Sequence, residues 1–153
     1  MAGRLISRVP TLMAASALVI GACSTDDRSM VPVACKSGPD TIATALAGAP
    51  GAVEVEGTPL SGCLTPASDP ADVQAVGASY VAVAADLAAI AREDSESPEA
   101  TQLGYLVGAV RRGAGRTGGV HDELVRRLDQ ELSGVDTASA AFREGERAGL
   151  ASG

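Results

Sequence analysis

The chain contains few of the residue types that build binding and catalytic sites. It has no Trp, its only aromatic residues are Tyr80, Tyr105 and Phe142, and its only histidine is His121. Base-stacking surfaces need more aromatic rings than this, so the composition argues against nucleic-acid binding. The sequence also lacks a GxSxG elbow, a CxxC pair, a Walker A loop and a dinucleotide-binding fingerprint. We therefore predict no catalytic residues, no metal ligands and no cofactor.

Basic residues are also scarce. The 153 residues include 12 Lys and Arg against 19 Asp and Glu, which gives a formal net charge of −7. Arg4 and Arg8 are the only charged residues before residue 23, so the rest of the chain has 10 basic and 19 acidic residues and a charge of −9. An acidic chain of this kind repels phosphate backbones, which again excludes a nucleic-acid partner.

The first 22 residues have the layout of a secretory signal. Two arginines precede an uncharged apolar run over residues 9–22, which is shorter than the roughly 20 residues of a transmembrane helix. The run ends in Ile20-Gly21-Ala22-Cys23, and this sequence resembles the lipobox of bacterial lipoproteins. The resemblance implies that residues 1–22 are removed, that Cys23 carries the lipid, and that residues 23–31 are a tether. A plain secretory signal with an incidental Cys23 is the alternative.

The remaining cysteines, Cys35 and Cys63, form an even pair in a chain that we expect to be exported. An oxidising compartment favours a disulfide between them, which would stabilise the fold by about 3–4 kcal/mol. Two reactive or metal-binding thiols are the alternative. We expect a disulfide-bound lobe over residues 32–68, with short strands at VPVAC and AVEVEG and one or two helical turns at PDTIATALAG. Glu54 and Glu56 would then lie on a solvated strand face.

The character of the chain changes at residue 69, where a helical bundle over residues 69–150 is expected to form one domain with the lobe. Asp69 and Pro70 begin the first long helix as N-cap and first-turn proline. Its apolar residues recur at spacings of three and four: Val73, Val76, Tyr80, Val83, Leu87 and Ile90. This stripe is interpreted as the core of the bundle, and the alternative is a coiled-coil surface for another chain.

Three further helices are predicted. Ser97 and Pro98 begin one whose apolar face is Leu103, Leu106, Val107 and Val110. Gly104 and Gly108 lie on another side of this helix. They predict that a second helix of the folded domain crosses it closely, and not that this helix spans a membrane. The next helix has a buried stripe at Val120, Leu124, Leu128 and Leu132. Its solvated face has acid–arginine pairs four residues apart: Asp122–Arg126, Glu123–Arg127 and Arg127–Glu131. A last short helix over DTASAAFREGERAGL offers Ala138, Ala141, Phe142 and Leu150 to the core, and we expect it to fray after Gly145.

Two groups of residues are candidates for function. His121 could act as a general base or metal ligand, but adjacent helical residues do not face one another, so a solvated helix-start histidine is the preferred interpretation. The second candidate is a basic patch around a glycine-rich turn that could bind a small anion. It comprises Arg111, Arg112, Arg116, Arg126 and Arg127. The alternative is that these arginines complement a helix C-terminus and pair with acids.

The segments GTPLSGC and LGYLVGAVRRGAGRTGGVHDELVRRL, within residues 57–132, resemble small exported bacterial proteins of unknown function. That resemblance implies no activity. The predicted fold is mainly α, an irregular three- to four-helix bundle preceded by a small disulfide-bound lobe with short strands. The expected function is that of a non-enzymatic binding or structural lipoprotein. We expect the protein to lie in the bacterial cell envelope, where it is anchored by lipid and faces the periplasm or the exterior. A protein of the envelope is its possible partner. Small-anion binding and an enzyme centred on His121 are the alternatives.

Overall fold

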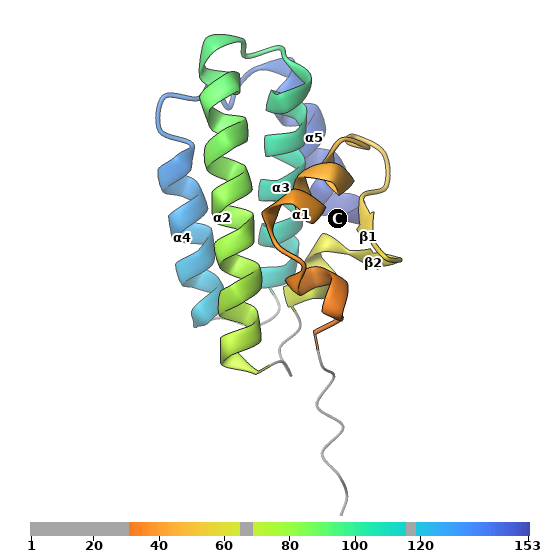
Figure 1. Cartoon of the computed structure of the whole chain (residues 1–153). Coiled ribbons are helices and arrows are strands. Elements are labelled where there is room, and N and C mark those ends of the chain that lie inside the picture. The colour runs from red at the N-terminus through yellow and green to blue at the C-terminus, as the bar shows by residue number, and fades with distance from the viewer. Residues whose placement is uncertain (1–30, 65–68, 116–118) are drawn as a thin grey trace, which may run out of the picture.

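The computed structural model describes residues 31–64, 69–115 and 119–153. It is mainly helical, with a small N-terminal lobe packed against a bundle, which confirms the predicted fold class (Figure 1). The predicted signal at residues 1–22, the lipidation site Cys23, most of the tether and Arg116 lie outside the described residues.

The N-terminal lobe is built from short elements. The 3-10 helix η1 (Val33–Lys36) leads into helix α1 (Pro39–Leu46), and strands β1 (Glu54–Val55) and β2 (Thr58–Pro59) precede the 3-10 helix η2 (Leu60–Leu64). The strand predicted at VPVAC is wrong. Ala34 and Cys35 are adjacent and both buried, which a helical turn allows but a strand with alternating faces does not.

The AVEVEG prediction is confirmed only for residues 54 and 55. β1 pairs antiparallel with β2, with Val55 opposite Thr58, so the strand's partner is the segment that follows it. Glu56 and Gly57 form the turn between them, with φ of 48° and 78°. Two consecutive positive φ values suit the two-residue hairpin that twisted strands require.

Helix α2 (Pro70–Glu93) begins as predicted, because the Asp69 carboxylate accepts a hydrogen bond of 2.8 Å from the Ala71 N–H. Five residues of the expected stripe, Val73, Val76, Tyr80, Val83 and Leu87, are buried in the protein's own core. Ile90 is 46% exposed, so the prediction is wrong at that position. A 3.5-residue repeat drifts by about 20° per heptad around a straight helix. Towards the end of α2, the core positions therefore pass to Ala84, Ala88 and Ala91, which are buried.

Helix α3 (Pro98–Ala114) lies at the centre of the bundle. The Ser97 hydroxyl caps it by accepting from the Ala100 N–H at 3.2 Å. The predicted apolar face of Leu103, Leu106, Val107 and Val110 is buried, and so is the opposite side with Gly104 and Gly108. These two glycines pack against helix α5 (Ala140–Ser152), which confirms the predicted close crossing and identifies the partner helix.

The crossing of α3 and α5 is a contact between backbones. A Cβ atom on Gly104 would overlap the carbonyl oxygen of Phe142, and one on Gly108 would overlap that of Glu146. Gly145 and Gly149 of α5 face the backbone of α3 in the same way. The expectation that the last helix frays after Gly145 is therefore wrong, because its glycines are packing positions.

Helix α4 (Val120–Glu131) covers another side of α2 (Figure 1). Leu124 and Leu128 of its predicted stripe are buried, and Leu132 is partly buried. In α5, Ala141 and Phe142 are buried as expected, but Leu150 is exposed. Ala138 precedes the helix and is exposed as well. Buried residues of the lobe and of the bundle belong to one continuous hydrophobic core.

Candidate functional site

The predicted basic patch begins at the C-terminal end of α3. There, Arg111 forms ion pairs with Asp129, at 3.1 Å, and with Glu146. Arg112 donates to the carbonyl oxygens of Leu150, at 3.0 Å, and of Ala151. Arg111 therefore links α3 to α4 and α5, and Arg112 satisfies two carbonyls near the end of α5.

Arg126 and Arg127 lie one helix further along and share a single acidic partner. Arg126 donates two hydrogen bonds of 2.8 Å to Glu123, and Arg127 donates one of 2.9 Å. The hydrogen bonds from the two guanidinium groups lower the pKa of Glu123 to about 2. Of the predicted pairs, Glu123–Arg127 is confirmed. Asp122–Arg126 is wrong, because Arg126 pairs with Glu123 and the Asp122 carboxylate accepts from the Gly119 N–H at 3.1 Å. The four described arginines of the patch thus contact protein acceptors, and an anion at this turn would compete with those acceptors.

His121 is not the solvated residue that we predicted. It is 6% exposed, and its Nε2 lies 3.1 Å from the carbonyl oxygen of Leu64 at the end of η2. No local sequence pattern indicated that η2 folds back over the start of α4. Among the described residues, no three His, Cys, Asp or Glu side chains cluster as a metal site would require. His121, at the start of α4, therefore links the bundle to the lobe.

The predicted disulfide is confirmed. The sulfur atoms of Cys35 and Cys63 are bonded, their Cα atoms are 5.7 Å apart, and both residues are fully buried. The bond joins η1 to η2 and so closes the lobe. Glu54 and Glu56 are both exposed, as expected, although Glu56 lies in the hairpin turn and not on the strand.

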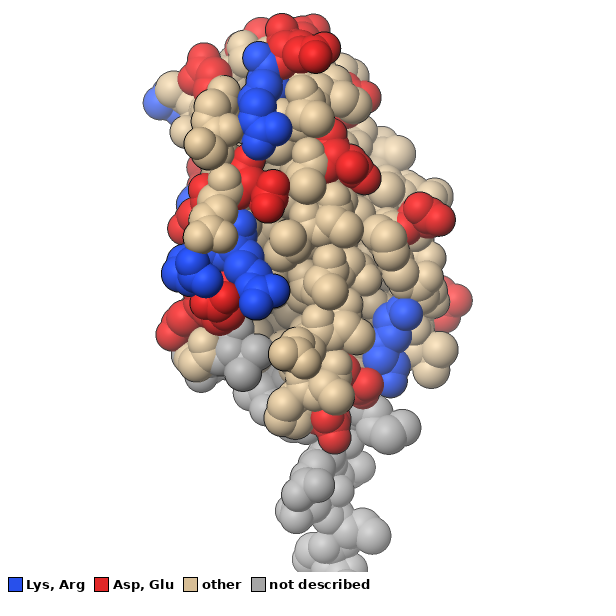
Figure 2. Space-filling model, turned by 60° about the vertical axis from the view of Figure 1, so that its left-hand side comes forward, with Lys and Arg blue, Asp and Glu red and all other residues tan. Residues whose placement is uncertain are grey.

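The feature that the sequence interpretation missed is the outer face of α2. Between Asp72 and Asp86 the helix has no charged residue, although much of its surface there is exposed or partly exposed. The outward side chains are Gln74, Ala75, Ala78, Ser79, Ala82 and Ala85. Figure 2 shows the side of the molecule where α4 and α2 lie, and the middle of that side is a continuous area of uncharged atoms. We call these six side chains the α2 outer face.

A shallow depression adjoins this face at the contact between α2 and α4. Val73, Gln74, Gly77 and Ala78 line one side, and Glu123, Leu124 and Arg127 line the other. Its floor is apolar and its α4 rim is charged. The available signal was the run of thirteen uncharged residues from Val73 to Ala85. We interpreted only the apolar stripe within it, as core or as a coiled-coil surface, and not the residues between.

The length and composition of α2 also meet the criterion for a membrane-spanning helix, and it is the one helix among the described residues that does so. The criterion is met equally by core helices of soluble proteins. In this fold, one side of α2 packs on α1, α3 and α4, and that packing accounts for the apolar residues on its buried side.

No protein-family model matches the chain, and neither a curated protein nor a solved structure matches it.

Proposed function

We propose that this protein is a bacterial lipoprotein, held at an envelope membrane by lipid on Cys23, and that its folded part docks an envelope protein through the α2 outer face. The first half of the proposal is supported by the apolar run of residues 9–22 and the lipobox-like Ile20-Gly21-Ala22-Cys23. A buried methylene contributes about 0.8 kcal/mol, so two or more acyl chains hold a protein stably on a bilayer.

The observation that carries the docking proposal is the missing charge on the α2 outer face. The chain has 19 acidic residues, yet about 20 Å of an exposed helix, at 1.5 Å per residue, has no charged side chain. Charged residues are depleted at the centres of protein interfaces. Small side chains also let a second helix approach closely, as the glycines of α3 and α5 do within this molecule. The partner that fits is therefore a protein that presents an uncharged helix.

The anchor is tested by the variant Cys23→Ser in the native host. We expect the parent protein to incorporate radiolabelled palmitate and to sediment with membranes. The variant should lose the label and leave the membrane fraction. A Cys23→Ser protein that stays in the membrane fraction would refute the lipid anchor.

The docking face is tested by photo-cross-linking in intact cells. A photoreactive amino acid replaces Ala78 in one strain and Glu144, which is exposed on α5, in the control strain. We expect a discrete adduct from position 78 only, and we expect Ala82→Glu to abolish it while the melting temperature stays unchanged. Identical adducts from both positions, or an adduct that survives Ala82→Glu, would contradict the proposal. An adduct with twice the mass of the chain would show that the face binds a second copy of this protein and not another envelope protein.

A further inference from the structure

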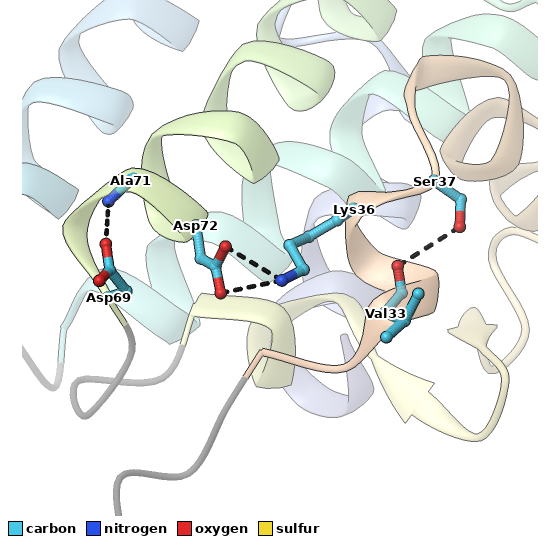
Figure 3. Close-up of polar contacts among 6 residues, drawn as sticks. All are labelled: Val33, Lys36, Ser37, Asp69, Ala71 and Asp72. Atoms are coloured by element: carbon cyan, nitrogen blue, oxygen red, sulfur yellow. Dashed lines mark hydrogen bonds and ion pairs between the residues drawn. The ribbon is translucent and has the colours of Figure 1, made fainter.

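Among the residues that the structure describes, the most exposed large hydrophobic side chain lies close to the start of the fold. Val33 is 79% exposed, whereas Ile90 and Leu150 are 46% and 45% exposed. Its position is fixed by local bonds, because the Cys35 N–H donates to the Pro32 carbonyl at 3.0 Å and the Ser37 hydroxyl donates to the Val33 carbonyl (Figure 3). Ala34 and Cys35 beside it are buried. The turn therefore holds Val33 away from the core, towards the solvent.

Val33 lies at the same end of the molecule as the start of α2. Lys36 Nζ donates to both carboxylate oxygens of Asp72 at 3.0 Å, which joins η1 to the first turn of α2 (Figure 3). Val31 is 2% exposed and fixes the chain entry to this region. We call this region, with Val31, Val33, Lys36 and Asp72, the tether end.

The segment that would join the lipid to the fold is short compared with the molecule. From Cys23 to Val31 there are eight Cα–Cα steps, which reach at most about 29 Å when fully extended. The 24 residues of α2 are about 36 Å long at 1.5 Å per residue. An inverted domain, with Glu93 at the membrane and the tether end pointing away, would need a longer tether than the chain has.

Both ends of the bundle have acidic side chains. Glu93, Asp94 and Glu96 are exposed at the end of α2, and Asp69 and Asp72 lie at the tether end. Figure 2 shows acidic residues at both ends, with basic residues among them. Charge therefore favours neither orientation, and the length of the tether decides between them.

We propose that the tether end is a membrane-contact surface, on which Val33 enters the interfacial region of the bilayer while the α2 outer face stands away from the lipid. The inference rests on the proposed lipid anchor for the proximity of the bilayer. The geometry then assigns the orientation: the N-terminal turn of α2 faces the lipid and its C-terminal turn faces away.

Single tryptophans test this orientation without background, because the chain has no Trp. Val33→Trp and Ile90→Trp form a matched pair, since both replace an exposed aliphatic residue. Val33 lies in η1, which is joined to the first turn of α2, and Ile90 lies in the last turn of α2. Each chain, starting at Cys23, is coupled through the Cys23 thiol to maleimide lipid in vesicles of phosphatidylcholine and phosphatidylglycerol. Cys35 and Cys63 do not react because they form the buried disulfide. Fluorescence is read with and without lipids that carry a nitroxide near the headgroup.

The expected result is a shift of Val33→Trp emission to shorter wavelength and its quenching by the nitroxide lipid, with Ile90→Trp unchanged. An unshifted and unquenched Val33→Trp would overturn the proposal, and so would equal quenching at both positions. Chemical coupling replaces enzymatic acylation in this experiment. A negative result in the vesicle experiment therefore contradicts the proposed orientation alone. Whether Cys23 carries lipid in the cell is decided separately by the palmitate label.

Discussion

Helices α2 and α3 are neighbours that both have small residues outside their main core stripe, and they differ in what covers those residues. On α3, Gly104 and Gly108 are covered by the backbone of α5. On α2, alanines at positions 75, 78, 82 and 85 lie on an outer face that no described segment buries. The comparison teaches that small residues on a helix allow close approach of another helix, and that this fold uses one such surface internally and leaves the other open.

The largest effect should come from closing the space between α3 and α5. In Gly104→Ala, the new Cβ would overlap the Phe142 carbonyl and lie 2.9 Å from the Glu146 nitrogen. Both are backbone atoms, so no side-chain rotation relieves the clash. We expect a loss of more than about 3 kcal/mol in the free energy of unfolding, at the upper end of overpacking effects, measured by urea denaturation.

Gly77→Ala in α2 is the matched control. Its Cβ would lie 3.5 Å from Leu124 Cδ1, an ordinary contact with a side chain. Alanine is favoured over glycine in a helix by up to about 1 kcal/mol, so stability should stay the same or rise. Equal losses of unfolding free energy from Gly77→Ala and Gly104→Ala would contradict the claim that the glycine of α3 is covered more closely than the glycine of α2.

A somewhat smaller loss of stability is expected when the disulfide is removed, because this bond closes the lobe that packs beside both helices. Replacing Cys35 and Cys63 together by alanine should lower the free energy of unfolding by about 3 kcal/mol, because the unfolded chain regains the freedom that the cross-link removes. Urea denaturation of the double variant and of the oxidised parent measures the difference. A loss below about 1 kcal/mol would mean that packing alone holds the lobe.

The two buried tyrosines compare α2 and α3 directly. Tyr105 of α3 accepts a hydrogen bond from the buried Val53 N–H at 3.2 Å, and Tyr80 of α2 donates to the Leu60 carbonyl at 2.8 Å. Tyr105→Phe leaves a buried donor without its partner, which costs about 1–3 kcal/mol. Tyr80→Phe should cost less, since carbonyl oxygens tolerate under-satisfaction better. Thermal melts of both variants give the order, and a reversed order would contradict this reasoning.

The smallest effect concerns the charged rim of the depression beside α2. The pKa of Glu123 is lowered from 4.5 to about 2, chiefly by the hydrogen bonds from Arg126 and Arg127. A lowered pKa in the folded state adds stability above the unfolded pKa, and this stability is lost as the pH falls from about 4.5 to about 2. Melting temperatures across this range should fall slightly more in the parent than in Glu123→Gln. Identical profiles at low salt would show that the pairs contribute nothing to folding.

Much of the helical core could be predicted because its signals are local. The caps Asp69 and Ser97, the prolines after them and the leucine spacing of α3 are short-range patterns, and Gly104 and Gly108 indicated a close crossing. The errors have tertiary causes. His121 is buried because η2 folds over it, and α5 continues past Gly145 because α3 covers its glycines. The α2 outer face was missed because a run of apolar residues does not reveal which of them point outward.

The central claim is that the α2 outer face is covered by a partner in the envelope. Carbene footprinting, read residue by residue by mass spectrometry, tests it most directly on the purified protein, on the protein anchored to lipid vesicles, and in intact envelopes. The account predicts strong labelling of the α2 outer face in the first two samples and its protection in envelopes. Exposed residues on α5, such as Glu144, should label equally in all three. Equal labelling of the α2 outer face with and without the envelope would contradict the claim.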